Sequence, residues 1–225
     1  MRSLVVAFLG LTTVACAPSL EAVVVTDGGK VPDGATSTPT PAQRAVAEGF
    51  VALGKKDGVT LYKREAERGL EFAVEGDLPA SPERVRRVML DYPAHTKWQE
   101  RLAECKVLAR GDDWADVYER LSLPMLDDRD YTLHVTWGAD GDVLWSRFTT
   151  ANDKGPPEVD GVVRVTLHEG SWTFAPIQEG KATHAFYRFH LDIDSSFAQS
   201  LGSGSAQGEM IDLFAQITAE LPSYP

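Results

Sequence analysis

The spacing of hydrophobic residues along the chain predicts a series of strands framed by helices. Between Leu70 and Leu78, apolar residues alternate with mostly acidic ones, which is typical of an antiparallel strand with one face in water. Helical spacing occurs in three other places, each with a capping residue before it or a glycine or proline after it. The three helical stripes are Ala42, Ala45, Val46, Phe50 and Leu53 before Gly54, Val85, Val88 and Met89 after Ser81 and Pro82, and Met210, Leu213, Phe214, Ile217 and Leu221 before Pro222.

Almost all of the chain between the second and third helices is predicted to be strand. Runs rich in β-branched and aromatic residues follow one another there without a helical stripe, so we expect hairpin connections in a meander. The runs are C-K-V-L-A, W-A-D-V-Y-E-R-L-S-L, D-Y-T-L-H-V-T-W, D-V-L-W-S-R-F-T-T, V-V-R-V-T-L, G-S-W-T-F-A-P and T-H-A-F-Y-R-F-H-L-D-I. A large sheet and a long amphipathic helix must each bury an apolar face. The sequence therefore predicts an α+β fold with a curved antiparallel sheet wrapped around the C-terminal helix.

The first forty residues stand outside this pattern. One arginine, a short apolar run and small residues precede Cys16, which predicts an export signal over residues 1–16. The ending T-V-A-C is similar to the lipobox of bacterial lipoproteins, in which the cysteine is lipidated, although Thr13 stands where leucine is usual. A signal peptide that is cut nearby without lipidation is the alternative. Residues 17–40 predict a flexible tether, so we expect the domain of residues 41–225 to be lipid-anchored at the periplasmic face of a bacterial outer membrane.

Charge and cysteine content narrow the range of partners. The 225 residues carry a formal net charge of −11 and contain no cluster of lysine and arginine, which argues against a nucleic-acid partner. Only two cysteines occur, and if Cys16 is acylated, no disulfide is possible. Cys105 is then predicted to be a small buried hydrophobic residue. We expect a monomer whose fold is held by its hydrophobic core.

The sequence contains none of the common catalytic or metal-binding motifs. The five histidines are scattered without an H-E-x-x-H, and no serine has a glycine two positions away on each side. The glycines between Gly202 and Gly208 lack the βαβ setting of a phosphate loop. The charged stretch L-P-M-L-D-D-R-D-Y, which begins at Leu123, lacks the spacing and the turning glycine of a calcium loop. We predict no catalytic residue, no metal and no cofactor.

Several segments occur in the order in which a known family has them. They are D-G-V-T-L-Y-K-R-E, S-P-E-R-V-R-R-V-M-L-D with Y-P-A-H-T-K-W, L-P-M-L-D-D-R-D-Y, G-S-W-T-F-A-P-I and F-Y-R-F-H-L-D. Together, from Ala42 to Leu221, they resemble the START domains, the steroidogenic-acute-regulatory-related lipid-transfer family. The resemblance implies a helix-grip fold, in which the curved sheet grips the long C-terminal helix over a tunnel for one lipid. It also implies non-enzymatic binding and transfer of a lipid or sterol, with Arg129 and Asp130 fixing a loop at the cavity rim. Loop motion around residues 197–208 is then expected to gate ligand exchange.

Two charged residues are predicted to lie on apolar strand faces. Glu119 alternates with Val117 and Leu121, and Arg147 alternates in the same way with apolar residues. A buried charge is costly unless it is paired, so we predict that the two side chains meet in the cavity and present polar atoms to a lipid head group or sterol hydroxyl. The alternative is that one strand is turned and its charge meets water. The other candidates for the ligand-binding site are Trp98, Tyr118, Arg129, Trp145, Phe186, Tyr187 and Phe214.

The sequence leaves two other functions open. The helix-grip superfamily includes aromatase and cyclase proteins that act on polyketides, and Glu119 or His184 could supply the acid–base group of such an enzyme. An interaction module would instead have a core filled by side chains. A search for a cavity between sheet and helix separates the interaction module from the other two functions.

Overall fold

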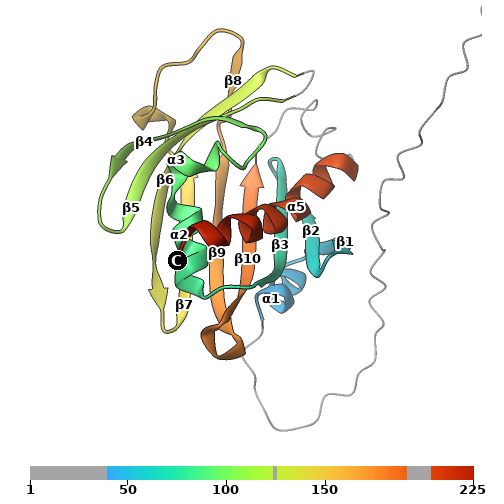
Figure 1. Ribbon diagram of the computed structural model, residues 1–225. Helices are drawn as coiled ribbons and strands as arrows, with labels where there is room; N and C mark the ends of the chain where they lie inside the picture. Colours follow the sequence, from blue (N-terminus) through green and yellow to red (C-terminus); the bar gives the residue numbers. More distant parts are fainter. Residues whose placement is uncertain (1–39, 124–125, 192–203) are drawn as a thin grey trace, which may run out of the picture.

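The computed structural model describes residues 40–123, 126–191 and 204–225 (Figure 1). The predicted signal peptide with Cys16, the predicted tether up to residue 39 and most of the expected gating loop lie outside these residues. In the described part of the chain, no helix is long and apolar enough to cross a membrane. The helices are α1 (Pro41–Ala47), α2 (Pro82–Leu90), α3 (Tyr92–His95) and α5 (Gly204–Glu220), with 3-10 turns at Asn152–Lys154, Gln178–Gly180 and Leu221–Ser223. The strands are β1 (Val51–Lys56), β2 (Val59–Glu65), β3 (Leu70–Leu78), β4 (Leu102–Arg110), β5 (Trp114–Leu121), β6 (Asp128–Asp140), β7 (Val143–Thr150), β8 (Val162–Arg164), β9 (His168–Ile177) and β10 (Ala182–Leu191).

The ten strands of the described residues form one sheet. Nine follow the order β1-β2-β3-β10-β9-β7-β6-β5-β4, and β8 pairs with β6 beside this path. Helix α5 crosses one face of the sheet, which we call the inner face, with α2 on the same side (Figure 1). On the outer face, Ala45 of α1 and Phe50 pack with Ala73 and Phe186 in a second, smaller core. The predicted α+β helix-grip architecture is confirmed.

Two details of the predicted element pattern are wrong. The first predicted helix runs to Gly54, whereas α1 ends at Ala47 and residues 51–56 form β1. Gly49, with a φ of +89°, ends the helix in the left-handed conformation that glycine adopts most easily. The predicted meander from β4 to β10 is interrupted once, because β8 runs parallel to β6 beside the path of the sheet.

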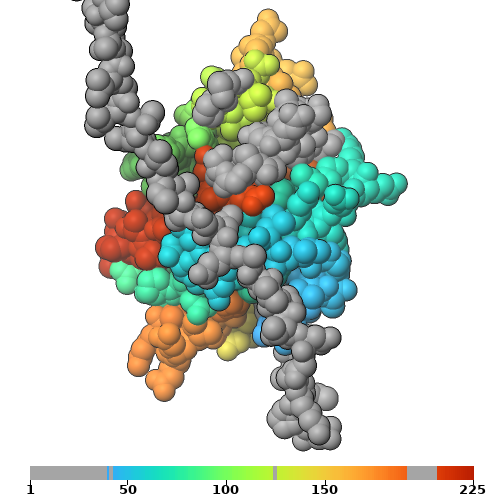
Figure 2. All heavy atoms as spheres, turned by 90° about the vertical axis from the view of Figure 1, so that its right-hand side faces the viewer, coloured from blue at the N-terminus to red at the C-terminus, as the bar shows by residue number. Residues whose placement is uncertain are grey.

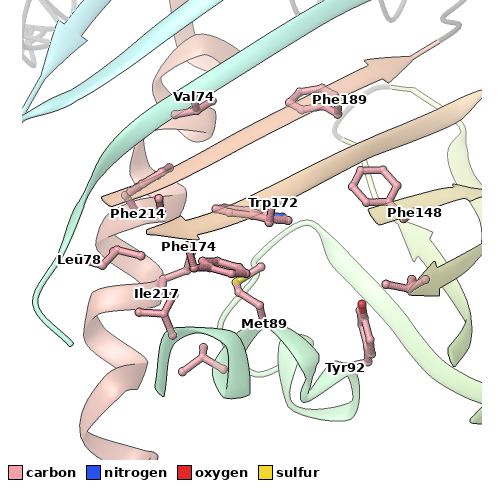
Figure 3. Close-up of a cluster of buried hydrophobic side chains, with 14 of the residues drawn as sticks. Val74, Leu78, Met89, Tyr92, Phe148, Trp172, Phe174, Phe189, Phe214 and Ile217 are labelled. Atoms are coloured by element: carbon pink, nitrogen blue, oxygen red, sulfur yellow. The ribbon is translucent and has the colours of Figure 1, made fainter. Parts of the chain in front are cut away.

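The main core lies between the inner face of the sheet, α5 and α2 (Figure 3). Phe214 and Ile217 of α5 are buried against the sheet, and the Phe214 ring lies 6.0 Å from that of Trp172, measured between centroids. Gly76 allows α5 to approach β3, because a Cβ at that position would lie 3.0 Å from Val59 and 3.1 Å from Phe214. Close packing of this helix therefore depends on a strand residue that has no side chain.

The C-terminal residues are fastened to α2. The Arg84 guanidinium donates to the backbone carbonyls of Leu221 and Tyr224, and the Tyr224 hydroxyl donates to Asp91 at 2.7 Å. Figure 2 shows these last residues, in red, next to the green surface of α2. The end of α5 is thus fixed to the helix beside it.

A buried ion pair joins β8 to β6 on the outer face. The side chain of Asp130 is 1% exposed, and Arg164 donates to both of its oxygens, from Nε to Oδ1 at 2.6 Å and from Nη2 to Oδ2 at 3.0 Å. The Tyr118 hydroxyl donates to Oδ2 at 3.1 Å. Arg129 is buried too and donates to the carbonyl of Asp127. For Asp130, the implied place at the cavity rim is therefore wrong, because its carboxylate fixes β8 instead.

His184, also on the outer face, predicts a pH dependence of stability. It forms a hydrogen-bonded ion pair with Glu75 (Nε2–Oε2 3.4 Å) and a second with Asp77 (Nδ1–Oδ1 2.8 Å), and together they raise the pKa of His184 to about 9. Because this pKa is higher in the folded than in the unfolded chain, the stabilisation is complete below about pH 6.5 and is lost as the pH rises through about 9. The free energy of unfolding can be measured by urea titration at about pH 6 and at about pH 9.5, for the native chain and for His184→Gln. Between these two pH values, the native chain should lose ~1 kcal/mol more than the variant does, a figure that allows for the partial exposure of the ring. Equal losses in both proteins would contradict this.

Candidate functional site

Two adjoining chambers lie between the sheet, α5 and the segment that follows α3. The outer chamber has a volume of about 260 Å³ and lies beside the first half of α5. The inner chamber has a volume of about 130 Å³ and lies between α2, α3 and the inner faces of β5, β6 and β7. Gln99, His168, Tyr187 and Leu213 line both, so the two chambers lie directly side by side, and we call them together the cavity. Side chains do not fill the space between sheet and helix.

One wall of this cavity is a stack of aromatic rings from β9 and β10. Tyr187 stacks on Trp172 with ring centroids 4.2 Å apart and an interplanar angle of 9°, and on Phe189 at 4.9 Å. Phe148 of β7 extends the wall, 6.3 Å from Tyr187. Figure 3 shows Trp172, Phe148 and Phe189 on the sheet, with Met89 on the helical side opposite. Such a surface offers apolar contact along a ligand, with few polar atoms to be satisfied.

The inner chamber also has a polar wall around Glu119. The Cys105 thiol donates to Oε1 of Glu119 at 3.7 Å, and the Tyr131 hydroxyl donates to the same carboxyl group. Among the described residues, no basic side chain forms an ion pair with Glu119. Burial raises the pKa of Glu119, which favours the uncharged carboxylic acid.

His168 lies where the two chambers meet. Its ring is enclosed by the rings of Tyr131, Phe148 and Phe189, with centroid distances of 4.7, 5.0 and 6.3 Å. The residue is 8% exposed, and its Nδ1 is buried without a hydrogen-bond partner in the described part of the protein. Burial lowers the pKa of His168 to about 3, so the imidazole is neutral at physiological pH.

Within the described ranges, one group of side chains has the geometry to hold a metal ion. The ligand atoms of His95, Cys105 and Glu119 lie within 4.8 Å of one another. The Nε2 of His95 lies 3.2 Å from the carbonyl oxygen of Val88, which leaves Nδ1 for a ligand. Metal binding would require the Cys105 thiolate, and burial raises the pKa of this thiol well above its usual value. The fit is therefore poor at neutral pH.

Glu119 and Tyr187 are the two predicted site residues that line the cavity. Phe214 is buried in the core against Trp172, beside the cavity. Trp98 packs on His95 with centroids 5.0 Å apart, and its Nε1 is buried. The predicted ligand contacts of Glu119 and Tyr187 stay predictions, because no ligand has been observed.

The predicted meeting of Glu119 and Arg147 in the cavity is wrong. On β7, Leu144, Ser146 and Phe148 are buried, so the alternate residue Arg147 faces outward. Its guanidinium lies over the Trp145 ring, 4.5 Å from the centroid. Three other residues that were predicted to line the cavity also lie on outward-facing positions of their strands. They are Tyr118, Trp145 and Phe186.

Most of the lining residues escaped the sequence prediction, among them four polar residues of the inner chamber. Two of them, His168 and Tyr131, hold polar atoms at the inner chamber, and a third, Ser146, lies on the buried face of β7. The fourth is His95, in the short helix α3. One signal was available for His168, which is in phase with Trp172 on the same strand. A histidine in phase with buried aromatic residues points to the inner face.

A curved antiparallel sheet that grips a long C-terminal helix over an internal cavity defines the helix-grip class of folds. The STAR-related lipid transfer protein of Xanthomonas axonopodis is similar over 77% of this chain and 99% of its own, with a TM-score of 0.67 and 24% identity. Human STARD10 matches with a TM-score of 0.69 and 17% identity, over 84% of this chain and 82% of its own. The Zhui aromatase/cyclase of Streptomyces sp. R1128 is more distant, with a TM-score of 0.51 and 10% identity over 68% of this chain and 93% of its own. The chain therefore has the fold of the START domains, as the sequence predicted. The sequence matches no protein-family model and no curated protein.

Proposed function

We propose that the protein binds an apolar small molecule, a lipid or sterol, in the internal cavity and that it does so without catalysis. The observation that carries this proposal is the pair of adjoining chambers with their aromatic wall. Affinity would come from burying apolar ligand surface: about 300 Å² would contribute roughly 7 kcal/mol before the costs of association. Lipid-transfer proteins are among the similar structures, which supports the same class of ligand.

We also propose that the domain is attached to a membrane through a lipidated Cys16. The support is the sequence alone: an apolar run and the ending T-V-A-C, followed by a segment with the composition of a tether. A lipid-anchored domain with an apolar cavity would stay close to the membrane from which it takes its ligand. This placement would suit transfer of the ligand.

Mass spectrometry of the purified full-length chain tests the ligand. We expect native spectra to show one apolar molecule per protein, and solvent extraction to release it for identification. A protein that is empty on purification and takes up no offered phospholipid, sterol or fatty acid would contradict the proposal. The same spectra would show acylation as an added mass that Cys16→Ser removes.

An enzymatic function is the second candidate, and the polar wall of the inner chamber favours it. Glu119, Tyr131 and His95 place proton-transfer groups beside the space where a ligand would lie. His184 does not contribute, because its ion pairs lie on the outer face. If a bound molecule is released with a changed mass after incubation with the protein, the enzymatic function becomes the better hypothesis.

A further inference from the structure

The junction of the two chambers holds a buried polar atom, Nδ1 of His168. His168 Nδ1 is buried, has no partner among the described residues, and belongs to a ring that lines both chambers. Leaving a buried polar atom unsatisfied is costly, and native proteins seldom do so without a ligand or ordered water there. The enclosing rings of Tyr131, Phe148 and Phe189 hold the imidazole in place. A ligand that fills the cavity lies against this imidazole ring.

The chemistry of the missing partner follows from the neutral imidazole. One of its nitrogens carries a proton and the other a lone pair, so Nδ1 either donates or accepts according to the tautomer. A hydroxyl group can do both, whereas an ether or a hydrocarbon cannot. The hydroxyl is thus the ligand group that suits His168 in either tautomer.

The charged residues around the inner chamber indicate which net charge the ligand can carry. Its lining includes Glu119 and no lysine or arginine. The undescribed segments 124–125 and 192–203 contain no lysine or arginine either. An anionic head group placed there would meet a carboxyl group and no compensating cation, which is unfavourable in a low-dielectric space.

The outer chamber has one basic side chain, and that side chain is engaged. Arg101 donates from Nη2 to Oε1 of Glu209 in α5 at 2.8 Å, and from Nε to Oε2 at 3.4 Å. An anionic ligand would have to compete with this carboxylate for the guanidinium. Neither chamber therefore offers a free cation among its described lining residues.

We infer that the cavity selects an uncharged apolar alcohol, with the hydroxyl bound at His168, and that it discriminates against fatty acids and phosphate- or sulfate-bearing lipids. This inference rests on the proposed function and narrows it to one ligand class. His168 acts as a specificity-determining residue through a single hydrogen bond. The aromatic wall supplies the remaining contact area.

Two matched ligand series test the selectivity on the purified full-length chain by titration. One is hexadecanol against hexadecanoic acid, and the other is cholesterol against cholesterol sulfate and the hydrocarbon cholestane. We expect the alcohol to bind about tenfold or more tightly than the charged member of its series. Charged members that bind as tightly as the alcohols would overturn the inference and leave the proposed function standing. Failure of every member to bind would overturn the inference, and the proposed function would fall with it if offered phospholipids were not taken up either.

The variant His168→Phe separates the hydrogen bond from the fit of the skeleton. We expect it to lower the affinity for the tighter-binding alcohol about tenfold and to leave the affinity for cholestane unchanged or higher. His134→Phe, on the outer face, is the matched control and should bind as the native chain does. If His168→Phe does not fold, as judged by circular dichroism, His168→Met replaces it, and the native ligand series decides on its own. Unchanged affinity of the alcohol for a folded His168 variant would overturn the role of this residue.

Discussion

Asp130→Asn is expected to lower the free energy of unfolding by about 3 kcal/mol or more. The substitution removes the charge that faces the Arg164 guanidinium, which is 11% exposed and cannot recover its hydration. The Tyr118 hydroxyl loses its charged acceptor as well. For a domain of this size, the melting temperature should fall by roughly 8 °C, and urea titration would give the free energy directly.

Asp128→Asn is the matched control, two positions earlier on the same strand. Asp128 pairs with Arg120 at 2.7 Å, but the two side chains are 22% and 38% exposed. Because water and salt screen such a pair, this variant should lose much less unfolding free energy than Asp130→Asn. If Asp130→Asn cost no more than its control, the buried pair would not be holding β8 to β6.

Ser146→Phe is expected to abolish ligand binding and leave the protein at least as stable. Ser146 is 4% exposed and lines the inner chamber, whose volume of about 130 Å³ can receive a phenyl ring. The ring would occupy the space in which we expect the ligand to lie. It would also give the side chains of the cavity wall van der Waals contacts that they lack around an empty space, which is stabilising. Bound ligand, measured by native mass spectrometry, should fall by more than about tenfold.

Thr149→Phe adds the same ring on the exposed outer face of the same strand. It should keep full occupancy, so a loss in both variants would point to general damage and not to the cavity. Full occupancy in a folded Ser146→Phe protein would show that the ligand does not use the inner chamber. The pair of variants thus locates the binding space independently of what the ligand is.

Most of the fold was predictable because alternation and helical spacing are local properties. The strand Leu70–Leu78 has the bounds that its apolar pattern predicts, and the apolar stripe from Met210 to Leu221 follows α5 to its end. The errors arose where a local signal was overruled. Phe50 continues the spacing of α1, yet Gly49 ends that helix and the following residues pair with β2. The parallel pairing of β8 has no signal in the spacing at all.

The site was harder to predict because it depends on the phase of each strand. Arg147 was assigned to the inner face with Trp145, an aromatic residue that in fact lies outside beneath the guanidinium. Glu119 was assigned correctly, since its neighbours on the same face are aliphatic. The partners of Glu119 are not a distant arginine but Tyr131, directly opposite on β6, and Cys105, directly opposite on β4. Which side chains lie opposite each other on neighbouring strands depends on the register of the strands, and the register cannot be read from the sequence of either strand alone.

The central position of β10 has a consequence for the nascent chain. This strand lies between β3 and β9, although it is the last strand to leave the ribosome. Until Leu191 has been synthesised, the sheet consists of two separate halves with open edges, and α5 has no complete surface on which to pack. Pairing over such long sequence separations is slow and comes late. We therefore expect the sheet to fold only after translation has reached its last residues.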